Sequence, residues 1–196
     1  MRRVEGVTRR VSFADLQRMP DDGNRYELFD GELRVVPSPV PIHQRLVRRL
    51  LEIVLEFTKH AGGEVFNAPF DIVLSDYDVV QPDIIYFSPA TAARIRPREH
   101  VRFRPDLAIE VLSPSTARID RGRKRELLAR HGLPEYWLAD YDARTLEVWL
   151  LAAPETPLVA GASRIESPRI LESGTYTSST QPGLALDVNA LFAGIE

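Results

Sequence analysis

The segment at residues 106–112 limits the fold of this chain more than any other part of its sequence. It reads Asp-Leu-Ala-Ile-Glu-Val-Leu and is apolar apart from its two acids, which is typical of a central strand buried on both faces. Turn residues follow at 113–116, and a helix is expected over residues 119–131, closed by Gly132. A further strand is expected over residues 135–140. The sequence therefore predicts a buried sheet with a helix between two of its strands.

The rest of the chain mixes strand and helix patterns. Strands at 25–29 and 32–36 flank Asp30-Gly31, a strong hairpin signal. A short capped helix is expected after Ser12, and the clearest helix is expected over residues 41–61, where apolar residues recur at steps of three and four. Shorter elements are expected as strands at 64–66, 70–74, within 79–87 and at 146–151, a weak helix at 89–96, short strands near Leu158, Ile170, Tyr176 and Leu184, and a helical turn at 187–192. This order indicates one α/β or α+β domain with a mixed sheet.

Composition excludes several classes of protein. The chain has 196 residues, 44% of them hydrophobic, and a net charge of −3, which is an ordinary globular balance. It has no cysteine, so disulfides, thiolate metal sites and cysteine nucleophiles are excluded. No apolar run approaches the roughly 18 residues of a membrane span, and no signal peptide is visible. We expect a cytoplasmic protein with a single domain over residues 1–196, its core at about 12–192 and a flexible arm at 1–11.

Positive charge is concentrated in one stretch of the chain. Residues 94–130 contain eleven basic and five acidic residues, a net charge of +6. Such a stretch either presents a positive surface to a polyanion or forms a solvated surface rich in arginine. Lysine is rare, because Lys59 and Lys124 are the two lysines among 25 basic residues. Lysine is therefore the exception in a chain whose other basic residues are arginines.

Two acids occupy positions where a carboxylate is costly. Glu110 shares a strand face with Ala108 and Leu112, and a buried carboxylate must be paired, protonated or bound to a metal. Asp83 follows Pro82 at the mouth of an apolar strand. Two carboxylates on neighbouring strands would form an oxygen-rich site suited to Mg²⁺ or Mn²⁺. The alternatives are a structural salt bridge for Glu110 and a capping role for Asp83.

Lys124 lies on the helix that follows the Glu110 strand. Leu127 and Leu128 stand three and four residues further on, so Lys124 points along the packing face of that helix. An ammonium group there could reach the carboxylates, whereas the alternative is a lysine that snorkels from the helix edge.

Taken together, these motifs resemble the Uma2 (DUF820) family of restriction-type endonucleases in the PD-(D/E)XK nuclease superfamily. The resemblance runs from about Ser12 to Phe192. The segments that carry it are Tyr26-Glu27-Leu28-Phe29-Asp30-Gly31, Pro37-Ser38-Pro39 with His43, Gln81-Pro82-Asp83-Ile84, Glu110-Val111-Leu112-Ser113-Pro114-Ser115, Lys124, Pro134-Glu135-Tyr136-Trp137 and Pro182-Gly183-Leu184.

The resemblance implies a restriction-endonuclease-like core, with a mixed central β-sheet flanked by helices and an N-terminal helix and β-hairpin. It also implies an endonuclease that hydrolyses phosphodiester bonds in DNA with Mg²⁺ or Mn²⁺, and that acts as a homodimer. Asp83, Glu110 and the backbone carbonyl of Val111 would hold the metal, with Lys124 acting on the attacking water. The superfamily's usual lysine position, two residues after the second acid, is Leu112 here.

Other residues are assigned less directly. Glu27 matches an acid of the family and is either part of the site or a surface charge of the hairpin. His43 either positions water or substrate or caps the long helix. The DNA backbone would be held by Arg118, Arg121, Arg123 and Arg125. The competing hypotheses are a catalytically silent nucleic-acid-binding protein and an accessory protein that acts through a partner.

Overall fold

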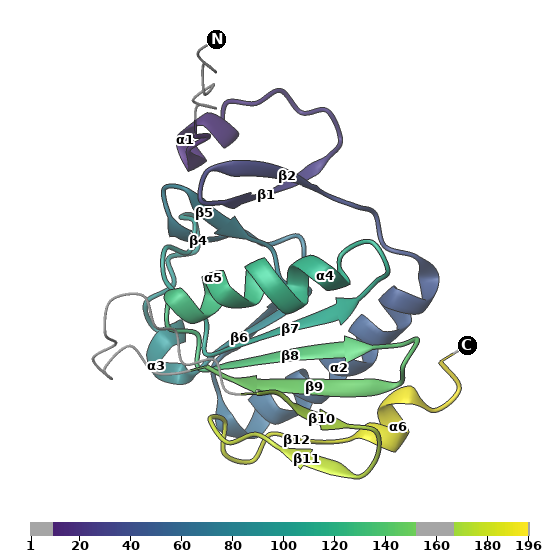
Figure 1. The fold of residues 1–196 in the computed structure, drawn as a ribbon. Coiled ribbons are helices and arrows are strands. Elements are labelled where there is room, and N and C mark those ends of the chain that lie inside the picture. Colours follow the sequence, from purple (N-terminus) through teal and green to yellow (C-terminus); the bar gives the residue numbers. More distant parts are fainter. Residues whose placement is uncertain (1–9, 152–166, 196) are drawn as a thin grey trace.

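The computed structural model describes residues 10–151 and 167–195 (Figure 1). Its helices are α1 (Phe13–Leu16), α2 (Pro41–Ala61), α3 (Pro89–Ala92), α4 (Ala117–Ile119), the π-helical turn η1 (Asp120–Lys124), α5 (Arg125–Arg130) and α6 (Val188–Phe192). Its strands are β1 (Arg25–Phe29), β2 (Glu32–Val36), β3 (Glu64–Asn67), β4 (Ile72–Ser75), β5 (Asp78–Val80), β6 (Ile84–Phe87), β7 (Leu107–Leu112), β8 (Glu135–Asp140), β9 (Thr145–Leu150), β10 (Arg169–Leu171), β11 (Thr175–Thr177) and β12 (Ala185–Asp187).

The main sheet is mixed, as the sequence predicts. Its order is β10-β9-β8-β7-β6-β3, in which β7 and β8 are parallel and all other pairs are antiparallel. The helical connection α4-η1-α5 joins the parallel pair, since only a crossover can return the chain to the same end of the sheet. Helix α2 lies on one side of the sheet and α5 on the other (Figure 1).

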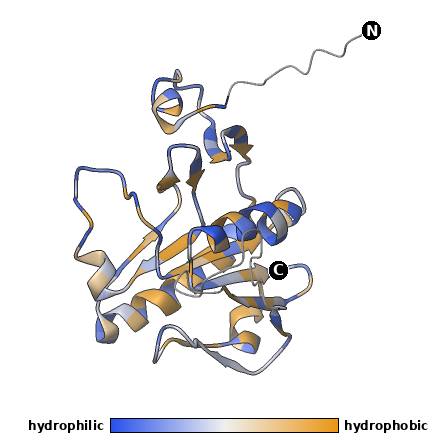
Figure 2. Cartoon of the chain, turned by 60° about the vertical axis from the view of Figure 1, so that its left-hand side comes forward, coloured by the Kyte–Doolittle hydropathy of each residue, from blue (hydrophilic) through white to orange (hydrophobic). Residues whose placement is uncertain are grey.

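Strand β7 is buried along its whole length and separates two cores. Ile109 packs in one core with Leu50 of α2, and Ala108 packs in the other with Leu127 of α5. This arrangement explains the apolar colouring of the central strands in Figure 2. It confirms the expected central strand, and it places Glu110 on the α5 side because alternate residues share a face.

A second sheet carries the N-terminal hairpin. Its order is β2-β1-β5-β4, and the hairpin strands have the predicted bounds. Asp30 and Gly31 have φ of 54° and 81°, so both central residues of the two-residue turn are left-handed, as the hairpin's twist favours. Ser12 caps α1 as expected, and Val11 N donates to Gly31 O at 2.8 Å.

A buried carboxylate joins the C-terminal segment to the sheet. Glu135 of β8 is 0% exposed. Its oxygens accept hydrogen bonds from Trp137 Nε1 (2.6 Å), Tyr176 Oη (2.8 Å), Ser178 Oγ (2.7 Å), and Thr180 N (3.2 Å) and Oγ1 (2.6 Å). Such a set of donors satisfies an acid inside the core.

The strand expected within residues 79–87 is confirmed as β6, which Gln81-Pro82-Asp83 separates from β5 because a proline removes a ladder donor. Other local expectations were wrong. The helix expected at 89–96 ends at Ala92, and the helix expected at 119–131 is interrupted by η1. The strand expected near Leu158 and residues 1–9 of the expected arm lie outside the described residues. Within the described part of the chain, no helix is both long and apolar enough to span a membrane.

Candidate active site

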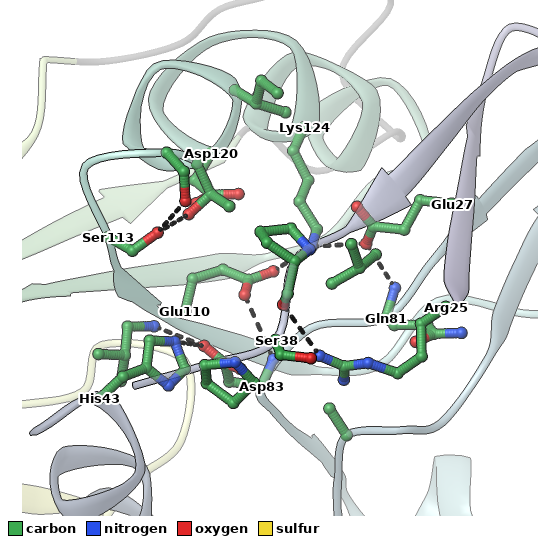
Figure 3. A pocket seen from close by; sticks show the side chains of 18 of the residues that line it. Arg25, Glu27, Ser38, His43, Gln81, Asp83, Glu110, Ser113, Asp120 and Lys124 are labelled. Atoms are coloured by element: carbon green, nitrogen blue, oxygen red, sulfur yellow. Dashed lines mark hydrogen bonds and ion pairs between the residues drawn. The ribbon is translucent and has the colours of Figure 1, made fainter. Parts of the chain in front are cut away.

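A cavity of about 580 Å³ lies where the N-terminal hairpin meets one end of the main sheet (Figure 3). The hairpin brings Arg25, Glu32 and Arg34 to its wall, and a cluster of six further ionisable side chains there comes from five separate parts of the fold. These are Glu27 of β1, His43 of α2, Asp83 before β6, Glu110 of β7, and Asp120 and Lys124 of η1. The structure thus brings together all the acids, the histidine and the lysine that the sequence suggested for catalysis.

Lys124 is the central cation of this group. Its side chain is 4% exposed, and its Nζ lies 2.7 Å from Glu27 Oε1 and 2.5 Å from Glu110 Oε1. Glu27 Oε1 also accepts a hydrogen bond from Gln81 N at 2.7 Å. The lysine is therefore an ion-paired residue of the site, and the snorkelling alternative is excluded.

Asp83 and Glu110 are linked through the backbone. Val111 N donates to Asp83 Oδ2 at 2.8 Å, and Asp83 N donates to Glu110 Oε2 at 3.3 Å. His43 Nε2 lies 3.2 Å from Asp83 Oδ2. The two acids are thereby held side by side, and His43 contacts the first of them.

Burial and charge act against each other in this cluster. Burial raises the pKa of the Glu110 carboxyl well above its usual range, although the Lys124 ammonium opposes the shift. Burial also raises the pKa of Asp120 to about 6, again opposed by Lys124. Burial lowers the pKa of Lys124, but the carboxylates of Glu110, Glu27 and Asp120 outweigh it and the net shift is upward. Lys124 is accordingly a permanent cation at neutral pH.

One residue of this site, Asp120, was not predicted from the sequence. Asp120 is 5% exposed and lines the cavity. Its position four residues before Lys124, on the same side of the expected helix, was an available signal. Tyr136 of β8 has a buried hydroxyl with no hydrogen-bond partner in the described part of the chain. Its pKa is raised, mainly by burial and secondly by the negative charge of Glu110.

The arginines expected to hold DNA lie outside the cavity wall. Arg121 is ion-paired with Asp140 (2.9 Å) and Glu147 (2.5 Å). Arg123 is paired with Glu32 and also donates to Phe29 O at 2.7 Å, and Arg125 stacks over the Trp149 ring at 4.2 Å. Arg118 is exposed. The positive charge of residues 94–130 is thus partly neutralised by acids from distant parts of the chain.

The donor set at Asp83 and Glu110 fits a hard divalent cation bound through few protein ligands. Among the described residues no group of three or more acids or histidines forms a ready metal cage. Mg²⁺, however, usually keeps several waters and uses one or two carboxylates. The two linked acids at the wall of a polar cavity meet that requirement.

Comparisons with known proteins agree with the fold. A family model named Uma2, described as "Putative restriction endonuclease", matches residues 13–186. The solved structure described as "a putative nuclease belonging to DUF820", from Anabaena variabilis ATCC 29413, has a TM-score of 0.74 at 20% identity, with 95% of this chain and 99% of that chain covered. No curated protein matches. Because the family model spans most of the sequence, the chain belongs to the Uma2 (DUF820) family.

Proposed function

We propose that the protein is a metal-dependent endonuclease that hydrolyses phosphodiester bonds in DNA. The observation that carries this proposal is the buried Lys124 ammonium beside Glu110, with Asp83 linked to Glu110, at the wall of one cavity. The family description and the DUF820 neighbour support the same class of reaction.

Asp83, Glu110 and the backbone carbonyl of Val111 would hold Mg²⁺ or Mn²⁺. When bound, such an ion supplies a positive charge for the phosphate and lowers the pKa of a coordinated water. The acids suit this role because they are fixed by backbone hydrogen bonds before any ion arrives.

Lys124 would donate hydrogen bonds to the attacking water or to the phosphate. Because its pKa is raised, it keeps its proton and stabilises developing negative charge, as a fixed donor aimed at the transition state does. Glu27 is a positioning residue that holds the ammonium from the hairpin side. His43 holds Asp83 in the same way, from helix α2.

Cleavage of both strands of a duplex is easiest with two such sites, so we include a homodimer in the proposal. The helix arginines Arg118, Arg121, Arg123 and Arg125 remain candidates for backbone contacts outside the cavity.

The test is incubation with supercoiled plasmid and with single-stranded DNA in Mg²⁺, Mn²⁺ or EDTA. We expect cleavage with either metal and none with EDTA. DNA binding without cleavage in any metal would support the silent binding protein, and stoichiometric capture of a protein partner without DNA binding would support the accessory protein.

Metal binding is tested separately by thermal unfolding. An ion at 100 times its Kd stabilises the folded state by about 2.7 kcal/mol, which is roughly 5–10 °C for a domain of this size. Asp83→Asn and Glu110→Gln should abolish that gain. Glu52→Gln, an exposed acid on α2, is the matched control and should respond as wild type does. Retention of the full gain in both site variants would place the metal elsewhere.

A further inference from the structure

The hairpin carries two arginines to the cavity that contains the acids. Arg25 of β1 and Arg34 of β2 both line it. We infer that these two side chains form the phosphate-binding side of the site, where they hold the nucleic-acid backbone against the acidic side. This inference rests on the proposed function and concerns residues other than the helix arginines Arg118, Arg121, Arg123 and Arg125.

Strand register places the two arginines next to the reacting groups. Arg34 is the cross-strand partner of Glu27, so their side chains project from the same face and start about 5 Å apart. Arg25 stands two residues before Glu27 and shares that face. Because Glu27 contacts Lys124, the hairpin face runs from the two guanidinium groups directly to the ammonium of the site.

Neither arginine has an acid of its own in the described parts of the chain, residues 10–151 and 167–195. Arg34 forms no ion pair there, and its Nε is buried without a hydrogen-bond partner. Arg25 makes one long contact, 3.4 Å from its Nη2 to Pro37 O. By contrast Arg121, Arg123 and Arg130 are each paired with two acceptors. A half-buried guanidinium without a partner is costly unless a ligand supplies the acceptor.

The chemistry of the cavity identifies that ligand as a phosphodiester. A ligand rich in carboxylates could also bind the two arginines. It has no group, however, that would make use of the acidic Asp83–Glu110 side of the cavity. A guanidinium fork matches the two non-bridging oxygens of a phosphate. Five carboxylates line the cavity, those of Glu27, Glu32, Asp83, Glu110 and Asp120, and besides the proposed metal the arginine and lysine side chains among its described lining residues are Arg25, Arg34 and Lys124. The two arginines therefore add to the positive charge that offsets these carboxylates when an anion enters the cavity.

The test is binding of a fluorescent 20-base-pair duplex and of the matching single strand, followed by anisotropy, with Ca²⁺ in place of Mg²⁺. The variants are Arg25→Gln, Arg34→Gln, the double variant and Arg34→Lys. Arg169→Gln, an exposed arginine on β10, controls for the loss of one positive charge. Thermal unfolding of each variant shows whether it is folded.

We expect about a tenfold loss of affinity for each hairpin variant, since a charge-assisted hydrogen bond is removed. The slope of log K against log salt should become shallower by about 0.9 for each arginine lost. Arg34→Lys should keep the slope but lose part of the affinity, because the charge remains while the fork does not. A purely structural role for these arginines would not change the salt slope.

The outcomes separate this inference from the proposed function. If wild type binds DNA and the hairpin variants lose affinity and slope, the inference stands even when no metal supports cleavage. It is overturned if the folded double variant binds with wild-type affinity and slope, if Arg169→Gln produces the same loss, or if wild type binds neither probe at low salt.

Discussion

Replacement of Lys124 tests the structure and the chemistry at once. Lys124→Met removes the charge with little change in length and leaves Glu27 and Glu110 buried without a cation. Removal of one partner from a buried ion pair costs about 3–5 kcal/mol, and both acids are 7% exposed or less. At about 2–4 °C per kcal/mol for a domain of this size, we expect the melting temperature to fall by roughly 6–20 °C.

Lys124→Arg keeps the charge and separates stability from activity. A planar guanidinium is larger than an ammonium, and overpacking a buried position costs about 1–3 kcal/mol. Its stability should therefore lie between wild type and Lys124→Met. Its cleavage rate should fall about as far as that of Lys124→Met, by about 100-fold or more, because a donor aimed at the transition state has moved.

The assay is plasmid cleavage at a temperature where all variants are folded, with urea unfolding alongside. Lys59→Arg is the control, because Lys59 lies on the exposed side of α2 beside Glu56, and it should change neither rate nor stability. If Lys124→Arg cleaves at the wild-type rate, the lysine is only a positive charge. If Lys124→Met is as stable as wild type, the two ion pairs contribute nothing to the fold.

Three further predictions concern buried polar groups, each measured by urea unfolding. Glu135→Gln should lose about 3–5 kcal/mol, because an amide cannot accept from all the donors around this carboxylate; a loss below 1 kcal/mol would contradict this. Tyr136→Phe should change stability by less than about 1 kcal/mol, since the hydroxyl has no partner among the described residues; a larger loss would reveal a hydrogen bond. The pKa of Asp120 is about 6 in the folded state, against 3.8 for an ordinary aspartate. As pH falls, the folded state therefore binds this proton before the unfolded state does. The free energy of unfolding of wild type in EDTA should rise by up to about 3 kcal/mol between pH 7 and pH 4. Asp120→Asn should remove that part of the slope, and an unchanged slope would refute the assignment.

Much of the fold was predictable because its signals are local. The helix at Pro41–Ala61 has the predicted bounds, since its apolar period, a proline at the start and Gly62 at the end all agree. Strand β7 was recognisable because a short, nearly continuous apolar run is typical of a strand buried on both faces. The hairpin followed from Asp30-Gly31 between the two strand patterns that flank it.

The site was predictable only where one residue was unusual in its own surroundings. Glu110 stood out as an acid in an apolar strand, and Lys124 as a lysine in a chain of arginines. Asp120 lacked such a contrast, since an acid on an expected helix is ordinary. The π-helical turn that buries it has no signal in the helix propensities of its residues.

Arginine pairing was not predictable for a different reason. Arg123 meets Glu32 across 91 positions of sequence, and Arg130 meets Asp30 across 100. A count of charge along the chain treats residues 94–130 as a basic surface. In the folded chain, however, acids of the hairpin pair with these arginines. The arginines that face the cavity come instead from the hairpin, a segment whose charge is unremarkable.

The position of Lys124 explains how the fold and the proposed chemistry depend on each other. On β7, Leu112 shares the α5 face with Glu110 and is buried in the core with Leu127, so that strand position serves packing. The π-helical turn, a feature often found at functional sites, supplies the ammonium from the helical connection that covers this face. Because Lys124 contacts Glu27 as well as Glu110, it joins the hairpin, the central strand and the helical connection. The residue that we assign to the transition state is thus also one of the contacts that hold the hairpin carrying Arg25 and Arg34, so a change at Lys124 should alter both halves of the cavity.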